Sequence, residues 1–485
     1  MKKKMKKIFA YLFVVLLLVS SCSKENNGSQ EVIEQEEAKN LTIFFVNDQH
    51  GQLNNFSKIK HIVDLEKLKT NVITVCSGDM FSGNPVVDNH PQKGYPMIDV
   101  MNRVGFDLSV IGNHEFDYGE TILNDRLNQA NFDWVCANVD MGNSGVPEPL
   151  DYKTINNNGL KVTFLGLVET NGSNNSTIPS THPWRVKNFT FERPENVIDQ
   201  YSDIKSQENS DLYIALTHLG HGGSSNSLGD TQIANQHPYF DLIIGGHSHQ
   251  KINTVINNIP IFQAGANLSN LGKITLTVKD KAIESINYEL INLNTYSEYD
   301  SELKTIIDSY DNLPFLNDVI GYSQLHHQKP QVGCFYTDAL KGVLNVDMTI
   351  QNTGGVRSTL NEGDITKREI FEISPFNNDC VIYNMSVGEI KNFLKGSGSG
   401  FYYSGIQIEQ IGRNIEIKDL NDNVISDATI LSLGTNDYIP AVYENYFPLT
   451  GDIQSLTAAE TVISYLENNN SVVNYPNCEH YFRFQ

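Results

Sequence analysis

Six short apolar segments recur in the first half of the chain, each followed by a polar junction. They are rich in β-branched residues and do not alternate between apolar and polar positions, which is typical of strands buried on both faces of an α/β sandwich. The segments occupy residues 41–46, 71–76, 108–111, 162–168, 212–217 and 242–245. Because ligands bind at the carboxyl ends of the strands in such sheets, we expect a functional site at the polar junctions.

The pattern changes after these segments. Residues 274–293 alternate between apolar and polar positions around a Lys-Asp-Lys turn, which predicts a hairpin that closes a first domain. Residues 299–313 have helical spacing and end before Pro314, so we expect a linker helix there. Residues 318–485 mix helical and strand patterns. They are expected to form a second domain, because 485 residues exceed what one hydrophobic core usually organises.

The N-terminus has the pattern of an export signal. A lysine-rich start precedes the apolar stretch 8–19, which is too short to span a bilayer, and the small residues before Cys22 resemble a bacterial lipobox. We therefore expect a lipoprotein signal peptide at residues 1–21 and a lipid on Cys22 that anchors an exported protein to the outer membrane, on its periplasmic or cell-surface side. An ordinary signal peptide with an incidental Cys is the alternative. The acidic residues 22–39 predict a flexible tether.

Composition narrows the classes of partner. The formal net charge of −22 argues against binding of nucleic-acid duplexes, which need a basic footprint. A small anionic substrate remains compatible with this charge if metal ions or local arginines reverse the field. The cysteines besides Cys22 are odd in number and irregularly spaced, so no disulfide framework is predicted from them. Cys76, inside an apolar segment, is expected to be a packing residue.

Metal-ligand residue types follow five of the predicted strands. These residues are Asp48 and His50, then Asp79, then Asn113 with His114 and Asp117, then His218, and finally His247 with His249. A single His or Asp at a strand end is usually a solvated loop residue, but five such ends in one domain indicate a shared site. Carboxylate, imidazole and amide oxygen donors suit two divalent first-row metals, which a shared Asp can bridge.

Such a centre predicts hydrolysis of phosphate esters. Two metals clamp the attacking and leaving oxygens of an in-line displacement at phosphorus and acidify the attacking water. His114 directly follows Asn113, so its ring is expected to reach the same substrate from outside the metal shell. Asp117 is expected to hold the imidazole in one tautomer and to favour its protonated form, which would stabilise negative charge on the phosphoryl group.

The motifs of this first domain resemble those of a known family. In order, they read D-x-H-G, G-D, G-N-H-E-F-D-Y-G, T-H-L-G and G-G-H-S-H. They are similar to the bacterial periplasmic 5'-nucleotidase and UDP-sugar hydrolase family, within the calcineurin-like metallophosphoesterases. The resemblance implies a four-layer α/β/β/α sandwich over residues 40–293, a linker helix over 294–317 and a smaller α/β substrate-binding domain over 318–485.

The resemblance also implies roles for individual residues. It assigns one metal to Asp48, His50, Asp79 and His249, and the second metal to Asp79, Asn113, His218 and His247. It makes His114 and Asp117 the catalytic dyad. The identity of the metals stays open among zinc, manganese, cobalt and iron, because all of them accept these donors.

The second domain carries further signatures of the same family. TIQNTGGVR (349–357) is followed by EGDIT and then by SPFNN (374–378). The resemblance implies that Arg357 contacts the substrate's phosphate or sugar and makes Asn378 a further candidate; a surface arginine after a Gly-rich turn is the alternative. It also makes Phe401, in FYYSG, a candidate for one aromatic wall of a nucleobase pocket.

Two stretches depart from the family pattern. Where the family usually has E-x-x-x-G-N, this chain reads KPQVGCF (329–335), so the Glu and the Asn are absent. Near the end, TNDYIPAVYENYFP (435–448) lacks the family's Gly-Gly-Asp-Gly turn, which precedes the second aromatic wall. The replacement stays open among Tyr438, Tyr443, Tyr446 and Phe447, and packing of a Tyr-rich strand in the core is the alternative.

The resulting expectation is a metal-dependent phosphohydrolase that converts 5'-nucleotides to nucleosides and phosphate. The alternatives within this class are 2',3'-cyclic nucleotides, UDP-sugars or a phosphoester without a nucleobase. A non-catalytic surface-binding lipoprotein is the alternative from a different class. The two full metal shells beside His114 and Asp117 argue against it, because a binding protein has no need for that dyad.

Overall fold

The computed structural model describes residues 37–172, 177–223, 227–469 and 472–485. The predicted signal peptide, Cys22 and nearly all of the predicted tether lie outside these residues. All contacts reported below lie within residues 38–485, which form one unit. In the described part of the chain, the structure contains no helix with the length and apolar character needed to cross a membrane.

The first of two six-stranded sheets has the strand order β14-β13-β1-β2-β3-β4. Its strands are β1 (Lys39–Val46), β2 (Asn71–Cys76), β3 (Leu108–Val110), β4 (Asp133–Val135), β13 (Asn270–Lys279) and β14 (Ala282–Asn292). Strands β1 to β4 are parallel, and β13 and β14 form the predicted hairpin antiparallel to β1. Asp280 and Lys281 both have positive φ at its tip, as a tight hairpin turn requires.

The second sheet has the order β11-β12-β10-β9-β7-β6. Its strands are β6 (Tyr152–Asn157), β7 (Leu160–Val168), β9 (Leu212–His218), β10 (Leu242–Ile244), β11 (Lys251–Ile256) and β12 (Ile259–Ala264). A separate two-stranded sheet joins β5 (Val139–Asp140) to β8 (Thr190–Phe191). All six strands expected from the apolar segments are therefore present, three in each large sheet.

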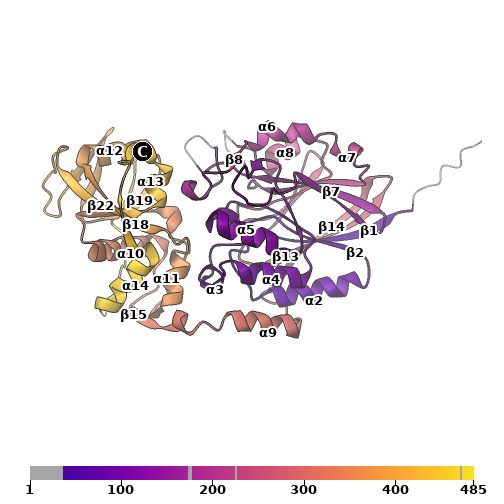
Figure 1. Cartoon of the computed structure of the whole chain (residues 1–485), viewed down its shortest axis with the longest axis horizontal. Coiled ribbons are helices and arrows are strands. Elements are labelled where there is room, and N and C mark those ends of the chain that lie inside the picture. The colour runs from indigo at the N-terminus through magenta and orange to yellow at the C-terminus, as the bar shows by residue number, and fades with distance from the viewer. Residues whose placement is uncertain (1–36, 173–176, 224–226, 470–471) are drawn as a thin grey trace, which may run out of the picture. The chain divides into compact units, whose positions relative to one another are not determined.

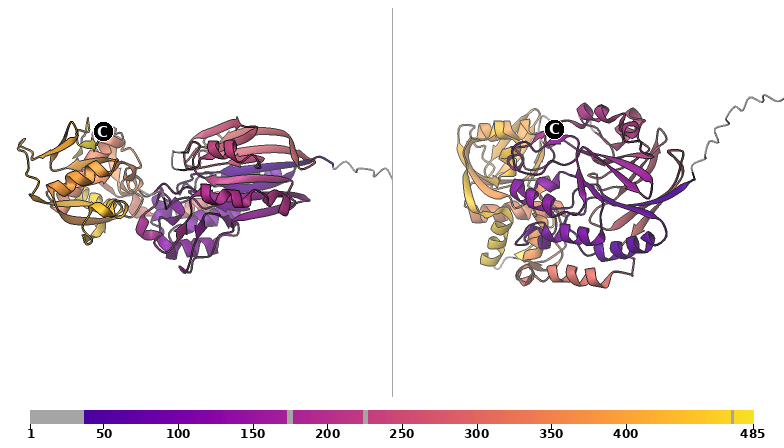
Figure 2. Two further views of the ribbon diagram at one scale, coloured as in Figure 1. Left: turned by 90° about the horizontal axis from the view of Figure 1, so that it is seen from above. Right: turned by 45° about the vertical axis from the view of Figure 1, so that its right-hand side comes forward.

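The two sheets pack face to face, with helices on their outer faces (Figures 1 and 2). Strand β1 shows why its residues do not alternate in polarity. Leu41, Ile43 and Phe45 pack between the sheets, whereas Phe44 and Val46 pack under the helices on the other side. Because both faces of the strand are buried from Leu41 to Val46, every position in that stretch is apolar except Thr42. The predicted four-layer α/β/β/α sandwich is confirmed.

Two groups of helices flank the sheets, and the first group, which covers the first sheet, contains the three longest helices of this domain, α2, α4 and α5. The first group comprises α2 (Phe56–Lys67), α3 (Pro85–Asp88), α4 (Tyr95–Val104), α5 (Gly119–Gln129) and the single turn η1 (His114–Phe116). The second group comprises α6 (Pro194–Val197), η3 (Ile198–Tyr201), α7 (Ile204–Gln207) and α8 (Asp230–Gln236), and the turn η2 (Pro183–Arg185) lies before β8.

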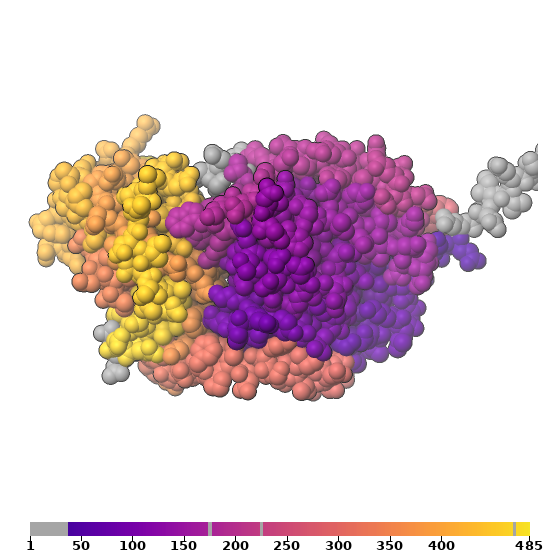
Figure 3. Space-filling view, viewed as in Figure 1, coloured from indigo at the N-terminus to yellow at the C-terminus, as the bar shows by residue number. Residues whose placement is uncertain are grey.

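The helix expected at residues 299–313 is α9 (Ser301–Tyr310). Asp300 caps it by accepting a hydrogen bond from the backbone N–H of Leu303 at 2.7 Å. Leu303 and Ile307 are buried against α2 and α4, so the helix packs on the first domain rather than standing free. In Figure 3 the salmon-coloured segment that includes α9 lies against the indigo part of the chain. The turn η4 (Pro314–Asn317) follows.

The remaining residues form a smaller α/β region around a six-stranded sheet of order β23-β18-β22-β16-β19-β25. Its strands are β16 (Met348–Asn352), β18 (Asp379–Ser386), β19 (Gly400–Ser404), β22 (Ile430–Asn436), β23 (Asp452–Thr457) and β25 (Tyr481–Arg483). Two small sheets consist of β15 (Val319–Ser323), β17 (Gly363–Thr366) and β24 (Val472–Val473), and of β20 (Gln407–Ile411) and β21 (Asn414–Lys418). The helices are α10 (Lys329–Leu344), α11 (Lys367–Ile373), α12 (Val387–Gly396), α13 (Tyr438–Val442) and α14 (Ala458–Asn469), with the turns η5 (Thr353–Gly355) and η6 (Glu444–Tyr446).

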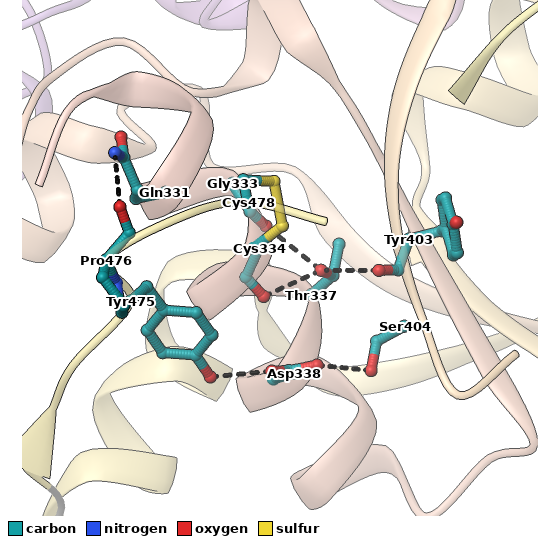
Figure 4. The surroundings of a disulfide bond; sticks show 10 residues. All are labelled: Gln331, Gly333, Cys334, Thr337, Asp338, Tyr403, Ser404, Tyr475, Pro476 and Cys478. Carbon is teal, nitrogen blue, oxygen red and sulfur yellow. Dashed lines mark hydrogen bonds between the residues drawn. A yellow bond between two sulfur atoms is a disulfide. The ribbon is translucent and has the colours of Figure 1, made fainter. Parts of the chain in front are cut away.

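A disulfide between Cys334 and Cys478 joins α10 to the C-terminal segment. The expectation that the cysteines form no readable disulfide framework therefore missed this bond. The two cysteines are 144 residues apart, and such a spacing carries no signal in a sequence. Figure 4 shows the surroundings, where the hydroxyl of Tyr475 donates a hydrogen bond to Asp338 Oδ2 at 2.7 Å. Cys76 is fully buried and unpaired, as expected for a packing residue.

Candidate active site

The loops that follow the strands of both sheets meet at one edge of the sandwich. The backbone N–H of Asp48 donates to the carbonyl of Gly78 at 3.0 Å, which joins the loops after β1 and β2. The hydroxyl of Ser77 donates to the carbonyl of Ile244 in β10 at 3.3 Å, so it links the two sheets. The backbone N–H of His247 donates to Asp48 Oδ1 at 3.1 Å. Residues from three strand ends, those of β1, β2 and β10, are thereby held beside one another.

Five of the predicted metal ligands have a left-handed backbone. These residues are Asp48, His50, Asp79, His247 and His249, whose φ angles lie between 49° and 72°. Left-handed conformations are unfavourable for residues with a Cβ atom, and they persist where surrounding structure fixes them, often at functional sites. The repetition of this feature at five ligand positions indicates that the loops are shaped to aim these side chains inward.

The potential ligand atoms form overlapping groups. Within the described residues, the donor atoms of three sets lie within 4.8 Å of one another, namely Asp48 with His50 and His249, His50 with Asp79 and His114, and Asp79 with His218 and His247. The first and third sets contain residues that the family resemblance assigned to the first and second metal, respectively. Asp79 belongs to the third set and is also grouped with His50 of the first set, as a bridging carboxylate would be.

In the first set, ring nitrogens of His50 and His249 face each other. His50 Nδ1 lies 3.1 Å from the carbonyl oxygen of Ser82, which can only accept, so Nδ1 carries the proton. His50 Nε2 then presents its lone pair to His249 Nε2 at 3.0 Å. Burial and the nearby His114 lower the pKa of His50 to about 3, which keeps the ring neutral. Asp48 Oδ1 lies 3.3 Å from His249 Nε2, and a cation among these atoms would satisfy all of them.

The second set brings a ring nitrogen against a carboxylate. His218 Nδ1 donates to the carbonyl of Ser77 at 2.6 Å, and Nε2 lies 2.9 Å from Asp79 Oδ2. Burial lowers the pKa of His218, but the Asp79 carboxylate outweighs that effect and raises it to about 10. His247 Nδ1 lies 3.0 Å from Asn113 Oδ1 in the same group. A divalent cation bound among these donors would displace the ring proton, because metal ligands must be deprotonated.

His114 and Asp117 form the expected pair. His114 Nδ1 lies 2.6 Å from Asp117 Oδ2, and Asp117 Oδ1 accepts a hydrogen bond from the hydroxyl of Thr181 at 2.9 Å. His114 Nε2 is therefore directed towards the ligand groups, 3.9 Å from Asp79 Oδ2. Burial lowers the pKa of His114, but the carboxylates of Asp117 and Asp79 raise it to about 9. The ring of Phe376 stacks on the imidazole at 5.8 Å.

Glu115 supports the site, although the sequence interpretation did not single it out. Its carboxylate is fully buried and accepts hydrogen bonds from the backbone N–H groups of Gly112, Asp79 and Met80 at 2.6, 3.0 and 2.7 Å. It therefore fixes the loop of Asp79 against the loop of Asn113. Its position within the motif G-N-H-E was the signal that could have identified it.

A cavity of about 300 Å³ opens beside the dyad. Arg357 and Asn378, the predicted substrate contacts, line it together with His114. The guanidinium of Arg357 lies 5.6 Å from the ring centroid of Phe376. Arg185, which the sequence interpretation missed, also lines the cavity and donates to Asn378 Oδ1 at 3.3 Å. No motif pointed to Arg185, because the short turn η2 that contains it has no recognisable pattern.

Phe401 is not among the residues that line this cavity. Only 1% of its surface is exposed, and its ring packs against Phe393 at 5.1 Å and Tyr443 at 6.1 Å. In this arrangement its ring cannot stack on a base. The prediction that Phe401 forms one aromatic wall of a nucleobase pocket is therefore corrected. Of the four aromatic residues left open for the second wall, Tyr438 lines the cavity. Tyr443 and Phe447 are buried in the same core as Phe401, and Tyr446 packs against it.

Comparisons with known proteins agree with the two-part organisation. The family model for calcineurin-like phosphoesterase matches residues 41–251, and the model for the 5'-nucleotidase C-terminal domain matches residues 315–441. The chain is 27% identical over 428 residues to the trifunctional nucleotide phosphoesterase protein YfkN of Bacillus subtilis, which covers 76% of this chain. It spans only 28% of the length of YfkN.

Two further proteins match over most of both chains. The 5'-nucleotidase of Vibrio cholerae is 24% identical over 452 residues, with 80% of each chain covered. The crystal structure of a 5'-nucleotidase precursor from Thermus thermophilus has a TM-score of 0.78 at 19% identity, and the match covers 91% of this chain and 98% of that chain. That likeness concerns the fold. Residues 41–251 therefore belong to the calcineurin-like phosphoesterases, and residues 315–441 form a 5'-nucleotidase C-terminal domain.

Proposed function

We propose that this chain is a metal-dependent phosphohydrolase that acts on nucleotides, with 5'-nucleotides as the first choice of substrate. One observation carries the proposal above the others. The imidazole of His114 is fixed by Asp117 at 2.6 Å and directs Nε2 into a cavity that both the ligand groups and Arg357 line. A protein that only binds its ligand does not need this combination, which argues against the non-catalytic alternative.

Two divalent metal ions fit the donor set. Asp48, His50, Asp79 and His249 would hold one ion, and Asp79, Asn113, His218 and His247 would hold the other. The close approach of His50 Nε2 to His249 Nε2 and of His218 Nε2 to Asp79 Oδ2 supports this assignment. When bound, such a pair supplies Lewis acidity at phosphorus and an activated water.

The dyad and the arginine act on the substrate directly. Asp117 keeps the proton on His114 Nδ1 and favours the protonated ring, so Nε2 can donate a hydrogen bond to a phosphoryl or leaving-group oxygen. Arg357 contributes a permanent positive charge, which would contact the phosphate or the sugar and orient the ester. Thr181 holds Asp117 from the side opposite His114 and so limits the rotation of the pair.

For a nucleobase, Tyr438 and Phe376 are the aromatic residues of the cavity. We assign base contact to Tyr438, because Phe376 already stacks on His114 and lies under Arg357. Asn378 would contact the sugar. UDP-sugars, 2',3'-cyclic nucleotides and phosphoesters without a base remain the competing substrates, and the burial of Phe401 is the observation that favours the last of them.

Phosphate release from AMP, UDP-glucose, 2',3'-cyclic AMP and ribose 5-phosphate, with zinc, manganese, cobalt or iron added in turn, tests the proposal. We expect turnover of AMP that requires a metal and exceeds turnover of ribose 5-phosphate. Equal rates on those two substrates would exclude base recognition. Absence of metal-dependent turnover on the whole panel would contradict the proposed activity.

The domain boundaries and the location of the protein complete the proposal. We place the phosphoesterase domain at residues 40–293, the linker at 294–317 and the substrate domain at 318–485. Export as a lipoprotein through Cys22 is supported by the Cys334–Cys478 disulfide, because disulfides persist in oxidising compartments outside the cytosol. Metabolic labelling with a radioactive fatty acid, compared with a Cys22→Ser variant, would test the anchor.

A further inference from the structure

One strand end at the candidate active site has no role in the mechanism above. Five of the six apolar segments are followed by candidate site residues, and the sixth, residues 162–168, is followed by Glu169. Strand β7 runs parallel to β9 with Val168 opposite His218, so Glu169 lies at the edge that carries the candidate metal ligands. Its backbone N–H donates a hydrogen bond to the carbonyl of His218 at 3.0 Å. Glu169 is fully buried there.

The carboxylate of Glu169 holds two segments of the chain together. Its Oε2 accepts a hydrogen bond from the backbone N–H of Asn171, and its Oε1 accepts one from the backbone N–H of Ser180 at 2.6 Å. A buried carboxylate is unfavourable unless its oxygens are hydrogen-bonded, and bonds to an ionised acceptor are stronger than bonds between neutral groups. The carboxylate therefore fixes the position of Ser180 relative to the end of β7.

Ser180 transmits this constraint to a candidate metal ligand. The carbonyl of Ser180 can only accept, so the side-chain atom of Asn113 that lies 3.1 Å from it is the amide nitrogen. The amide oxygen of Asn113 then lies among the candidate ligand atoms, 3.0 Å from His247 Nδ1. An amide turned the other way would present N–H groups, which do not bind a cation. The contact with Ser180 thus decides which atom of Asn113 faces the candidate metal centre.

Thr181 transmits the same constraint to the dyad. Its hydroxyl donates to Asp117 Oδ1 at 2.9 Å, and Asp117 Oδ2 lies 2.6 Å from His114 Nδ1. Ser180 and Thr181 both line the cavity that contains His114, whereas Glu169 is not among its lining residues. Glu169 can therefore influence a substrate in that cavity only through the residues that it holds.

We propose that Glu169 is a positioning residue for the hydrolytic reaction. It orients the ligand Asn113 through the carbonyl of Ser180, and it orients the dyad through the hydroxyl of Thr181. This inference rests on the proposed function, which supplies the metal assignment and the role of the dyad. Loss of Glu169 should therefore have two separable effects, one on a single metal ion and one on the rate of catalysis.

The contact through Ser180 is tested by calorimetric titration of the metal-free full chain with manganese. Glu169→Gln keeps the size of the side chain but places an N–H group against one of the two backbone donors. We expect the affinity for one of the two ions to fall about tenfold, because Asn113 is assigned to one ion, and the other affinity to change by less than about threefold. Thr181→Val should bind both ions as the wild-type protein does. Unchanged affinities in Glu169→Gln, or equal losses for both ions, would overturn the proposal.

The contact through Thr181 is tested by a double-mutant cycle on kcat at saturating metal. Thr181→Val removes the hydroxyl with little change of shape, and each single variant should lower kcat about tenfold. In the Thr181→Val background, Glu169→Gln should lower kcat by less than about threefold, because the path to the dyad is already broken. Losses that simply multiply would show that Glu169 does not act through Thr181 and would overturn the proposal.

Two further variants complete the experiment. Glu148→Gln is the matched control and should change neither measurement, because Glu148 also accepts a hydrogen bond from a backbone N–H, that of Met141 at 2.9 Å, but contacts no candidate site residue. If Glu169→Gln does not fold, Glu169→Asp replaces it with the same expected results, because the shorter side chain cannot reach both N–H groups. A lowered melting temperature with unchanged metal affinity and kcat would mean that Glu169 only supports the fold. A wild-type chain without phosphohydrolase activity would contradict the proposed function, while the manganese titration would still decide whether Glu169 orients Asn113.

Discussion

His218 Nε2 lies 2.9 Å from Asp79 Oδ2 while its other ring nitrogen donates to the carbonyl of Ser77. Because Nδ1 is used in the second bond, Nε2 is the nitrogen that faces the carboxylate oxygen in a fully buried place. Such a contact is unfavourable unless a cation or a proton lies between the two atoms. The contact between His218 and Asp79 therefore indicates that the candidate metal centre depends most directly on Asp79.

Replacing Asp79 with Ala should abolish phosphohydrolase activity and lower the bound metal below two ions per chain. The reason is that the shared carboxylate sets the spacing of a two-metal clamp. Metal content by plasma mass spectrometry after gel filtration measures the effect. Asp125→Ala, an exposed acid on α5, is the control and should retain metal and activity. Two tightly bound ions in the Asp79 variant would refute the bridging role.

Replacing His114 with Ala should leave the metal content unchanged and reduce kcat by about 10²- to 10⁴-fold, with a much smaller change in KM. A group that stabilises charge only in the transition state has this signature. Steady-state kinetics on the best substrate, with metal analysis on the same sample, separates the two effects. Loss of metal from the variant would show that His114 is a ligand.

Gln263 is expected to position the loop that carries His247 and His249. Its amide nitrogen donates to Asp230 Oδ2 at 2.7 Å, and its carbonyl oxygen accepts from the hydroxyl of Ser248 at 2.6 Å. Gln263→Ala leaves the buried Asp230 carboxylate with one partner fewer and releases Ser248.

We expect Gln263→Ala to weaken metal binding about 10-fold or more, in line with other residues that orient metal ligands. A competition titration with a fluorescent chelator measures the affinity without turnover. Gln454→Ala, in β23 at the other end of the chain, is the control. Unchanged metal affinity, together with a lowered melting temperature, would mean that Gln263 only supports the fold.

Asp88 should make the stability of the metal-free protein depend on pH. It is buried beside Tyr118 and accepts a hydrogen bond from the backbone N–H of Gly83 at 3.0 Å. Burial raises its pKa to about 7, against an ordinary value near 4 in the unfolded chain. Between these values the folded state holds a proton that the unfolded state has released, so this residue lowers stability as pH rises.

The full penalty is reached above pH 7 and amounts to about 4 kcal/mol. Asp88→Asn, which has no charge to bury, should therefore gain stability relative to the wild-type protein as pH rises from 4 to 8. Urea unfolding of both proteins across this range measures the difference. Asp125→Asn, at an exposed position, should show no such trend. A constant difference between Asp88→Asn and wild type would contradict the buried, protonated state.

The sequence by itself determined the layers of the first domain and the residue types at the edge that carries the candidate active site. Residues 41–46 of β1 are apolar apart from Thr42 because one face packs on helices and the other on the second sheet. Burial of both faces produces an apolar segment that can be recognised in a sequence. The parallel connections place every such strand end at the same edge. Asp48, Asp79 and His218 could therefore be grouped before any contact was known.

Tertiary structure decided what depends on contacts between distant segments. Phe401 lies in a motif that matches the family, which predicted that its ring contacts a nucleobase. Instead, Tyr443 and Phe393 pack against the ring, and Phe401 is part of the hydrophobic core. The Cys334–Cys478 bond joins residues whose separation gives no local signal. Local sequence patterns indicate which side chains are buried and where the backbone turns, because burial and backbone geometry repeat along a helix or strand. They do not indicate which distant side chain packs against a given residue, because that depends on the packing of the whole chain.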